Sequence, residues 1–309
     1  MQKCCSNILD AVGNTPLVHL RRTSPAGGAQ IYAKVECVNP GGSIKTRTAL
    51  GMIEAAERAG QLKPDSIIVE VTSGNQGIAM AMIGAVKGYK VRIVMPENMS
   101  VERQKLIKAY GAEIVLTPAG ASITEAIEGS LALAQDMAAK DSRVFLPRQF
   151  ENKNNPDIHR RTTAQEILAQ FEGPIDAFVA GFGTGGTITG IGEVLKQAHP
   201  RLRVYVAEPE NAAILAGHPI GHHVQQGIGD GVIPPILNRD IIDDIVLVSD
   251  EEACTAACRL ARDEGILCGV SSGTNVTAAV KVAARLGAGK TVVTVLPDTG
   301  ERYLSTGLF

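Results

Sequence analysis

The run Asn39-Pro40-Gly41-Gly42-Ser43-Ile44-Lys45-Thr46-Arg47 decides how this chain is interpreted. Its two glycines form a tight turn, and Lys45 stands where a helix is expected to begin after that turn. A lysine in such a place is usually a solvated surface residue, and the run lacks the Gly-x-x-x-x-Gly-Lys-Ser/Thr spacing of a nucleotide-binding P-loop. Two further motifs favour a reactive amine at Lys45 over both of these interpretations.

Each of these motifs places a glycine-containing turn between an apolar run and a helical pattern. They read Thr72-Ser73-Gly74-Asn75-Gln76-Gly77 and Gly181-Phe182-Gly183-Thr184-Gly185-Gly186-Thr187. A turn of this kind at the start of a helix directs backbone N–H groups and the positive end of the helix dipole at an anion. Together with Lys45, the motifs indicate a cofactor that carries a phosphate and an aldehyde, and a bound amino acid.

The second motif also admits a dinucleotide-binding interpretation. The glycines of residues 181–186 satisfy Gly-x-Gly-x-x-Gly, and Glu208 ends the next expected strand, where a ribose-binding acid would stand. Against this, Thr184 and Thr187 add two hydroxyl donors, which suit a terminal phosphate better than a pyrophosphate. The loop alone is compatible with both the phosphate-binding and the dinucleotide-binding interpretation. A nicotinamide-dependent dehydrogenase is therefore the alternative from a different enzyme class.

Composition favours an ordinary soluble globular protein. The chain has 309 residues, 45% of them hydrophobic and 20% charged, with a net charge of -2. This length is enough for two domains, and the charge argues against a nucleic-acid partner. No apolar stretch approaches the roughly 20 residues needed to cross a bilayer, and no signal-peptide-like core opens the sequence. We therefore expect a cytoplasmic protein without a membrane partner.

No metal site is expected. The six cysteines show no paired Cys-x-x-Cys framework, which favours reduced thiols. Cys254 and Cys258 share a helix face without a zinc-spaced partner, and the histidines of residues 218–223 lie in a loop with Pro219 and Gly221.

Short β-branched runs alternate with amphipathic stretches, which predicts βαβ units around largely parallel sheets. We expect strands at 67–71, 90–95, 113–116, 143–146, 177–180, 203–207, 245–248 and 291–296. We expect helices at 80–87, 101–110, 121–140, 159–171, 187–198, 251–264 and 275–286. The polar segment 152–156 is interpreted as a turn and a domain boundary, and 208–243 as a long loop with a functional role.

The motifs at 39–47, 72–77 and 183–187, with Gly269-Val270-Ser271-Ser272-Gly273, occur in the order and spacing of the cysteine synthase and cystathionine β-synthase family. The chain resembles that family nearly end to end. The resemblance implies an α/β fold of type II, similar to the tryptophan synthase β subunit, with two domains that each hold a mostly parallel twisted sheet flanked by helices. It implies a smaller, mobile domain at 36–150 with the Schiff-base lysine and the carboxylate loop. Residues 1–35 and 151–309 would form the larger domain with the phosphate-binding loop.

The resemblance also implies site residues and a cofactor, pyridoxal 5'-phosphate. Lys45 would carry it as a Schiff base and act as the catalytic base, and Asn75 would meet its ring hydroxyl. Ser271 would meet the pyridine nitrogen, where a neutral hydroxyl favours β-elimination over transamination or racemisation. The alternative for Ser271 is the N-cap of the helix expected at 275–286. The phosphate would be held by Gly183, Thr184, Gly185, Gly186 and Thr187. The substrate carboxylate would be held by Thr72, Ser73, Gly74, Gln76 and Gln149.

The activity implied is β-replacement on an activated serine through an aminoacrylate, most simply cysteine synthesis from O-acetylserine and sulfide. The alternatives within the family are cysteine breakdown with release of hydrogen sulfide, leaving serine, lanthionine or pyruvate, and cystathionine formation from serine and homocysteine. A catalytically silent partner of an acetyltransferase is a third class. The resemblance further implies a homodimer and serine acetyltransferase as a partner.

The chain departs from the family pattern at three places. Thr46 replaces a frequent Asp after the lysine, which removes a carboxylate from the first turn of the helix and alters a structural contact more than the chemistry. Gln76 stands where most relatives carry Thr, so there is less room beside the substrate α carbon. Asp230, in the glycine-rich run 226–234, stands where a small or aromatic residue is common. Its carboxylate is a candidate catalytic base for an incoming thiol or water, and the alternative is a turn aspartate that caps its neighbours.

Overall fold

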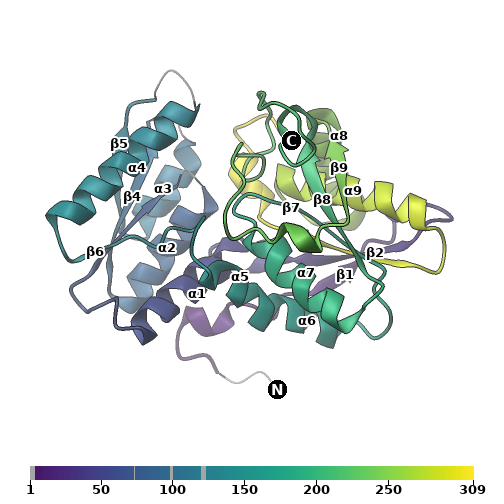
Figure 1. The fold of residues 1–309 in the computed structure, drawn as a ribbon, viewed down its shortest axis with the longest axis horizontal. Helices are drawn as coiled ribbons and strands as arrows, with labels where there is room; N and C mark the ends of the chain where they lie inside the picture. The colour runs from purple at the N-terminus through teal and green to yellow at the C-terminus, as the bar shows by residue number, and fades with distance from the viewer. Residues whose placement is uncertain (1–3, 73, 98–99, 120–122) are drawn as a thin grey trace. The chain divides into compact units, whose positions relative to one another are not determined.

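The computed structural model describes residues 4–72, 74–97, 100–119 and 123–309 (Figure 1). The chain forms two compact units, each with its own sheet. The first unit comprises Met1–Val12 and Lys45–Asn154, and the second comprises Gly13–Ile44 and Asn155–Phe309. The functional partition into a mobile 36–150 domain and a larger remainder stays a prediction.

The first unit is built on four parallel strands in the order β5-β4-β3-β6. The strands are β3 (Ile67–Val71), β4 (Lys90–Pro96), β5 (Glu113–Thr117) and β6 (Val144–Phe145). The helices are α1 (Lys45–Arg58), α2 (Asn75–Lys87), α3 (Val101–Ala109) and α4 (Ile123–Lys140).

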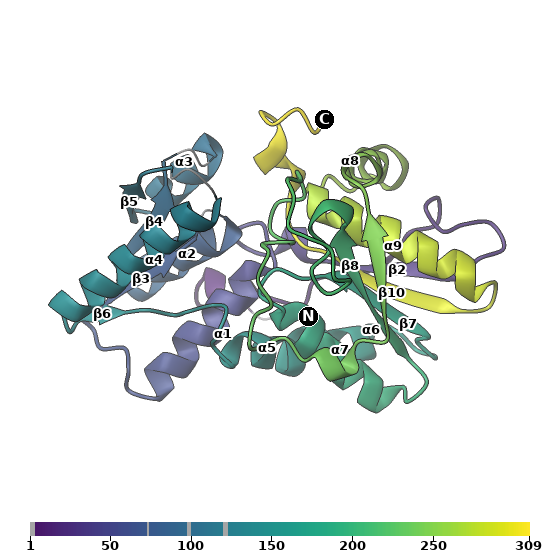
Figure 2. The same ribbon diagram turned by 45° about the horizontal axis from the view of Figure 1, so that its top comes forward.

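Successive side chains of these strands enter different clusters. Ile68 and Ile93 pack in a cluster with residues of α1, α2 and α3, whereas Val69 and Val94 pack with residues of α4. The strands and helices of this unit are labelled in Figure 2. A strand that is covered on both faces carries apolar residues at consecutive positions. This is why the expected strand at 67–71 agrees with β3 at both ends.

The second unit holds six strands in the order β1-β2-β10-β7-β8-β9. Only β1 runs antiparallel, against β2, and the other pairs are parallel. The strands are β1 (Leu17–His19), β2 (Gln30–Val35), β7 (Ala177–Gly181), β8 (Arg203–Pro209), β9 (Asp244–Val248) and β10 (Thr291–Leu296). The sequence analysis missed β1 and β2.

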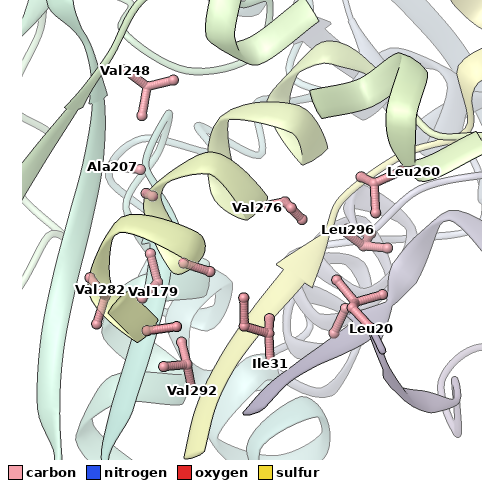
Figure 3. Packing of buried hydrophobic residues seen from close by; sticks show 14 of the residues in the cluster. Leu20, Ile31, Val179, Ala207, Val248, Leu260, Val276, Val282, Val292 and Leu296 are labelled. Atoms are coloured by element: carbon pink, nitrogen blue, oxygen red, sulfur yellow. The ribbon is translucent and has the colours of Figure 1, made fainter. Parts of the chain in front are cut away.

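Helices cover both faces of this sheet as well. They are α5 (Asn154–Ile158), α6 (Ala164–Gln170), α7 (Gly186–Ala198), α8 (Asp250–Arg259) and α9 (Val270–Leu286). Val179 and Val292 pack against Val276 and Val282 of α9 (Figure 3), whereas Phe178 packs in the cluster that contains residues of α6 and α7. The two units together confirm the predicted α/β class with mostly parallel sheets flanked by helices.

Two predictions about where helices begin were wrong. The segment 152–156 is not a turn throughout, because α5 begins at Asn154 and continues through a π-helical turn, His159–Thr163, into α6. The last long helix begins at Val270 rather than at residue 275, and its N-cap is Gly269. Ser271 therefore lies inside the first turn of α9, so the N-cap alternative for this residue is also wrong.

The long loop was predicted correctly. Residues 210–243 contain only two short 3₁₀ turns, Glu210–Ala212 and Arg239–Ile241. In the part of the chain that the structure describes, no helix combines the length and the apolar composition that crossing a membrane requires.

Candidate active site

The turn before Lys45 is fixed by hydrogen bonds within the second unit. Gly41 and Gly42 both adopt left-handed backbone, with φ of 77° and 71°. The Gly42 carbonyl accepts from the Thr299 N–H at 3.1 Å, and the Ile44 N–H donates to the Pro297 carbonyl at 2.8 Å. A Cβ on Gly42 would come within 2.7 Å of the Arg302 guanidinium, and the positive φ at this position favours glycine in any case.

Lys45 follows this turn as the first residue of α1, as predicted. Its side chain is partly buried, and the next three residues of the helix are buried. An amine at the first residue of a helix and on the end of a rigid turn has a defined position, which covalent attachment of a ligand requires.

The carboxylate loop follows β3 in the same unit. Gly74 is the N-cap of α2, and its N–H donates to Thr72 Oγ1 at 3.2 Å. Asn75 is the first residue of α2 and is partly buried. Ser73, which was also predicted to contact substrate, lies outside the described residues.

Gln76 is buried at 1% exposure, and neither its amide nitrogen nor its amide oxygen makes a hydrogen bond with a described residue. A buried amide without partners costs roughly 1–3 kcal/mol. Such a cost is relieved when a ligand supplies the missing partners, as the carboxylate predicted to bind this loop would.

Glu70, the fourth residue of β3, is a buried carboxyl that the sequence analysis did not select. Burial raises the pKa of Glu70 to about 8, although the Val71 N–H, the Gln76 amide and the charge of Lys45 all lower it. The Gln76 amide is close enough to lower this pKa, yet it does not reach good hydrogen-bond geometry. Glu70 is therefore mostly protonated at neutral pH, so it does not itself place a full negative charge near Lys45.

Gln149 lies in the first unit after β6. It is 5% exposed and follows Arg148, one of two described residues other than glycine with a left-handed backbone, at φ 52°. A non-glycine residue in this conformation marks a constrained segment. The constraint is compatible with the substrate-binding role predicted for Gln149.

The phosphate-binding loop joins β7 to α7 in the second unit. Gly185 has a φ of 81°, and α7 begins at Gly186 without an acidic residue in its first turn. A Cβ on Gly183 would overlap the Gly227 carbonyl, and one on Gly186 would overlap the side chain of Asn155. The loop therefore presents backbone N–H groups and an uncompensated helix terminus, and these fit the phosphate of pyridoxal phosphate.

Two supporting residues of this loop escaped the sequence analysis. Asn155 lies in α5, in the segment interpreted as a turn, and His159 follows α5, at the start of the helix expected at 159–171. Asn155 donates from Nδ2 to Thr184 Oγ1 at 2.9 Å. His159 is fully buried, with Nδ1 at 2.9 Å from Thr163 Oγ1 and Nε2 at 3.4 Å from Thr187 Oγ1. Pro156 was the available signal, because proline is tolerated in the first turn of a helix.

Helix α9 begins with the fourth motif. Ser271 is 6% exposed and lies one turn before Asn275, whose side chain accepts from the Gly181 N–H at 2.7 Å and donates to the Val295 carbonyl at 2.8 Å. A Cβ on Gly273 would overlap the Ala253 carbonyl of α8. The motif thus packs α9 tightly against α8 and ties it to the start of the phosphate-binding loop.

Asp230 lies in the exposed part of the glycine-rich run, in the second unit. A Cβ on Gly183 would lie 3.4 Å from Asp230 Oδ2, so the carboxylate is next to the phosphate-binding loop. The structure therefore brings together Asp230, the residues of 183–187 and their supports within one unit, and Lys45, Asn75 and Gln76 within the other.

Glu208 does not behave as a ribose-binding acid. Its carboxylate accepts the N–H groups of Leu215 and Ala216, each at 3.1 Å, and it is 1% exposed. Burial raises the pKa of Glu208 despite these bonds. The residue holds the start of the long loop, which removes the main support for the dinucleotide interpretation.

The six cysteines are free thiols. Among the residues that the structure describes, no three histidine, cysteine or acidic side chains gather as they would around a metal ion.

The matches to known proteins extend along nearly the whole chain. Residues 8–298 match the family described as pyridoxal-phosphate dependent enzyme. The chain is 50% identical over 309 residues to a cysteine synthase of Staphylococcus aureus, which covers all of this chain and 98% of that protein. It superposes with a TM-score of 0.93 on O-ureido-L-serine synthase, at 46% identity over 99% of this chain and 96% of the other. It superposes with a TM-score of 0.91 on a hydrogen sulfide-producing enzyme of Fusobacterium nucleatum, at 39% identity over 97% of this chain and all of the other.

Proposed function

Because the chain belongs to the pyridoxal-phosphate-dependent enzymes, and within them is similar to cysteine synthases, we propose that it joins O-acetylserine to sulfide, giving cysteine and acetate. The observation that carries the proposal is Lys45 at the first position of α1, in a chain 50% identical over its whole length to a cysteine synthase. Small amino acids are the substrates of this enzyme type.

The resemblance assigns residues to each part of the cofactor, pyridoxal phosphate. Lys45 Nζ would attach covalently to its aldehyde, and the loop 183–187 would bind its phosphate through backbone N–H groups and the Thr184 and Thr187 hydroxyls. Asn75 would meet the ring hydroxyl and Ser271 the ring nitrogen. When bound, pyridoxal phosphate supplies a carbonyl that captures the substrate amine and a ring that withdraws electrons from the α carbon.

The substrate carboxylate would bind Thr72, Ser73, Gly74, Gln76 and Gln149. Lys45 Nζ would take the α proton of the bound substrate as acetate leaves the β carbon. After sulfide has bonded to the β carbon, Lys45 Nζ would return a proton to the α carbon. In this scheme the protonated state of Glu70 matters, because an ionised carboxylate would stabilise the charged, non-basic form of Lys45.

Asp230 would act as a base for nucleophiles that carry a proton when they bind. A thiol or water must lose a proton as it attacks, and the Asp230 carboxylate would accept it. Hydrosulfide is already an anion near neutral pH and does not need this help.

A second candidate function is cysteine breakdown with release of hydrogen sulfide. It is favoured by the likeness to the hydrogen sulfide-producing enzyme of Fusobacterium nucleatum and by the carboxylate at Asp230, which would activate water or a second cysteine. Cystathionine formation from serine and homocysteine stays an alternative of the same chemistry. We further propose a homodimer in the cytoplasm, with serine acetyltransferase as a partner.

The proposal is tested by asking whether the protein binds pyridoxal phosphate covalently at Lys45. Purified protein loaded with pyridoxal phosphate should absorb in the violet, and borohydride should fix the cofactor on Lys45, as located by peptide mass. Lys45→Ala should abolish this covalent labelling and cysteine formation, because no other amine occupies the position. Lys87→Ala, which alters a lysine at the end of α2 paired with Glu57, is the matched control and should label normally. A colourless wild type after loading would refute the proposal.

A further inference from the structure

The segment 225–231, which overlaps the start of the glycine-rich run 226–234, has no regular secondary structure. Side chains must therefore hold it in place. Three of its residues, Gly227, Gly229 and Gly231, have left-handed backbone with φ of 89°, 70° and 75°. Glycines in this conformation leave a chain free to move unless other groups hold it. Asp230 lies among them.

Gln225 anchors the beginning of the run. It is fully buried, and its Nε2 donates to the Val248 carbonyl at 3.0 Å and to Asp250 Oδ1 at 2.9 Å. Its Oε1 accepts from the Thr274 hydroxyl at 2.8 Å. The run is therefore fixed at this end to β9, α8 and α9.

His223 bridges from this anchor to the residue before Asp230. The Gln225 N–H donates to His223 Nδ1 at 3.2 Å, and His223 Nε2 lies 3.1 Å from the Gly229 carbonyl. A backbone N–H only donates and a carbonyl only accepts, so both bonds form when the imidazole is neutral with its proton on Nε2. A Cβ on Gly229 would lie 2.9 Å from His223 Nε2, so the close approach requires glycine.

Beyond Gly229 the run rests on the phosphate-binding loop. The Gly229 N–H donates to the Phe182 carbonyl at 3.3 Å, and Asp230 Oδ2 would lie 3.4 Å from a Cβ on Gly183. The position of the Asp230 carboxylate over this loop therefore depends on where Gly229 is held.

We propose that His223 is a positioning residue that holds Asp230 where it accepts the proton of an incoming thiol. The inference rests on the proposed function and adds a residue to it. As sulfur bonds to the substrate β carbon, the thiol proton passes to the Asp230 carboxylate, and Lys45 protonates the α carbon. His223 touches neither substrate nor cofactor in this role, and it acts only through Gly229.

The test separates the two half-reactions in rapid-mixing experiments on loaded enzyme. His223→Asn keeps an acceptor for the Gln225 N–H but is too short to reach the Gly229 carbonyl. It should slow the addition of homocysteine about tenfold, as loss of a hydrogen bond worth about 1.4 kcal/mol would. Addition of sulfide and elimination of acetate should stay within twofold of wild type. In an Asp230→Asn background, His223→Asn should have no further effect on homocysteine.

His223→Gln retains a donor for the Gly229 carbonyl, so its rate of homocysteine addition should stay within about threefold of wild type. This variant tests the inference if His223→Asn does not fold. His222→Asn, at the exposed neighbouring histidine, is the matched control and should behave as wild type. Equal losses with sulfide and homocysteine, or an unchanged rate in His223→Asn, would overturn the inference. A wild type that takes up no cofactor, or does not turn over, would refute the proposed function instead.

Discussion

At the scale of single residues, the burial of Glu70 ties the stability of the fold to pH. The folded protein holds this proton up to about pH 8, whereas the unfolded chain releases it near the ordinary value of 4.5. Between these values the folded state binds more protons, so the free energy of unfolding falls as pH rises through this window and levels off above it.

Glu70→Gln removes the titrating group and keeps its shape. The free energy of unfolding of the wild type should therefore fall relative to that of the variant between pH 4.5 and 8, by up to about 5 kcal/mol. Urea unfolding of both proteins at several pH values measures the difference, in which groups common to both cancel. Parallel pH profiles would mean that Glu70 is ionised in the folded protein.

We expect Gln76 to favour substrate binding and to lower the stability of the folded protein. Gln76→Leu fills the same space without polar atoms, so it should raise the free energy of unfolding by about 1 kcal/mol. The same change should raise the KM for O-acetylserine at least tenfold, because the carboxylate loses a donor, and leave cofactor affinity unchanged. Gln61→Leu, at an exposed position, is the matched control. An unchanged KM would remove Gln76 from the substrate site.

The candidate site residues that the sequence analysis selected carry local signals in the sequence, whereas the residues that support them do not. Lys45 was identified because glycine turns and helix starts leave a local signal. Asn155 and His159 were not, because their importance comes from reaching Thr184 and Thr187 across the fold. Glu70 lies in an apolar strand, and its raised pKa reflects burial that the local pattern does not reveal.

At the scale of elements, the contact between α8 and α9 requires glycine at 273, since a Cβ there would overlap the Ala253 carbonyl. Gly273→Ala should therefore lower the free energy of unfolding by about 2 kcal/mol or more, since overpacking a tight contact costs about 1–3 kcal/mol. Gly129→Ala is the matched control, because a Cβ at this position of α4 meets no atom within 4 Å. It should raise stability by about 0.5–1 kcal/mol through helix propensity. Thermal unfolding of the two variants tests the pair, and equal effects would contradict the packing argument.

Elements were predictable where local pattern and tertiary environment agree. The buried parallel strands are continuous apolar runs, and β3 was predicted to the residue. For α2, the sequence analysis identified 80–87 as part of a helix but did not locate its start at Asn75, because the helix is buried at successive positions from Gln76 to Gly84, which leaves little amphipathic pattern to read. Strands β1 and β2 were missed because β1 is only three residues long and β2 includes the buried lysine Lys34, which pairs with Glu166.

At the scale of the whole molecule, both units place functional residues in the same way. Thr72 follows the carboxyl end of β3 and precedes α2, and Gly183 follows the carboxyl end of β7 and precedes α7. In parallel α/β sheets, ligands bind outside the carboxyl ends of the strands. The fold class was predictable from the alternation of strands and helices, whereas the division into units depends on contacts between distant segments.

The choice of donor decides whether the enzyme makes or degrades cysteine, and leaving-group chemistry predicts it. O-acetylserine loses acetate, the conjugate base of a carboxylic acid; cysteine loses hydrosulfide, the conjugate base of the weaker acid hydrogen sulfide; and serine loses hydroxide, the conjugate base of the far weaker acid water. The rate of β-elimination should therefore fall from O-acetylserine to cysteine to serine, because a weaker base is the better leaving group. Rapid mixing with each donor, followed by identification of the products by mass after adding sulfide, homocysteine or water, measures this order. Faster elimination from cysteine than from O-acetylserine would favour hydrogen sulfide release as the physiological reaction and leave the roles proposed for Lys45 and the phosphate-binding loop intact.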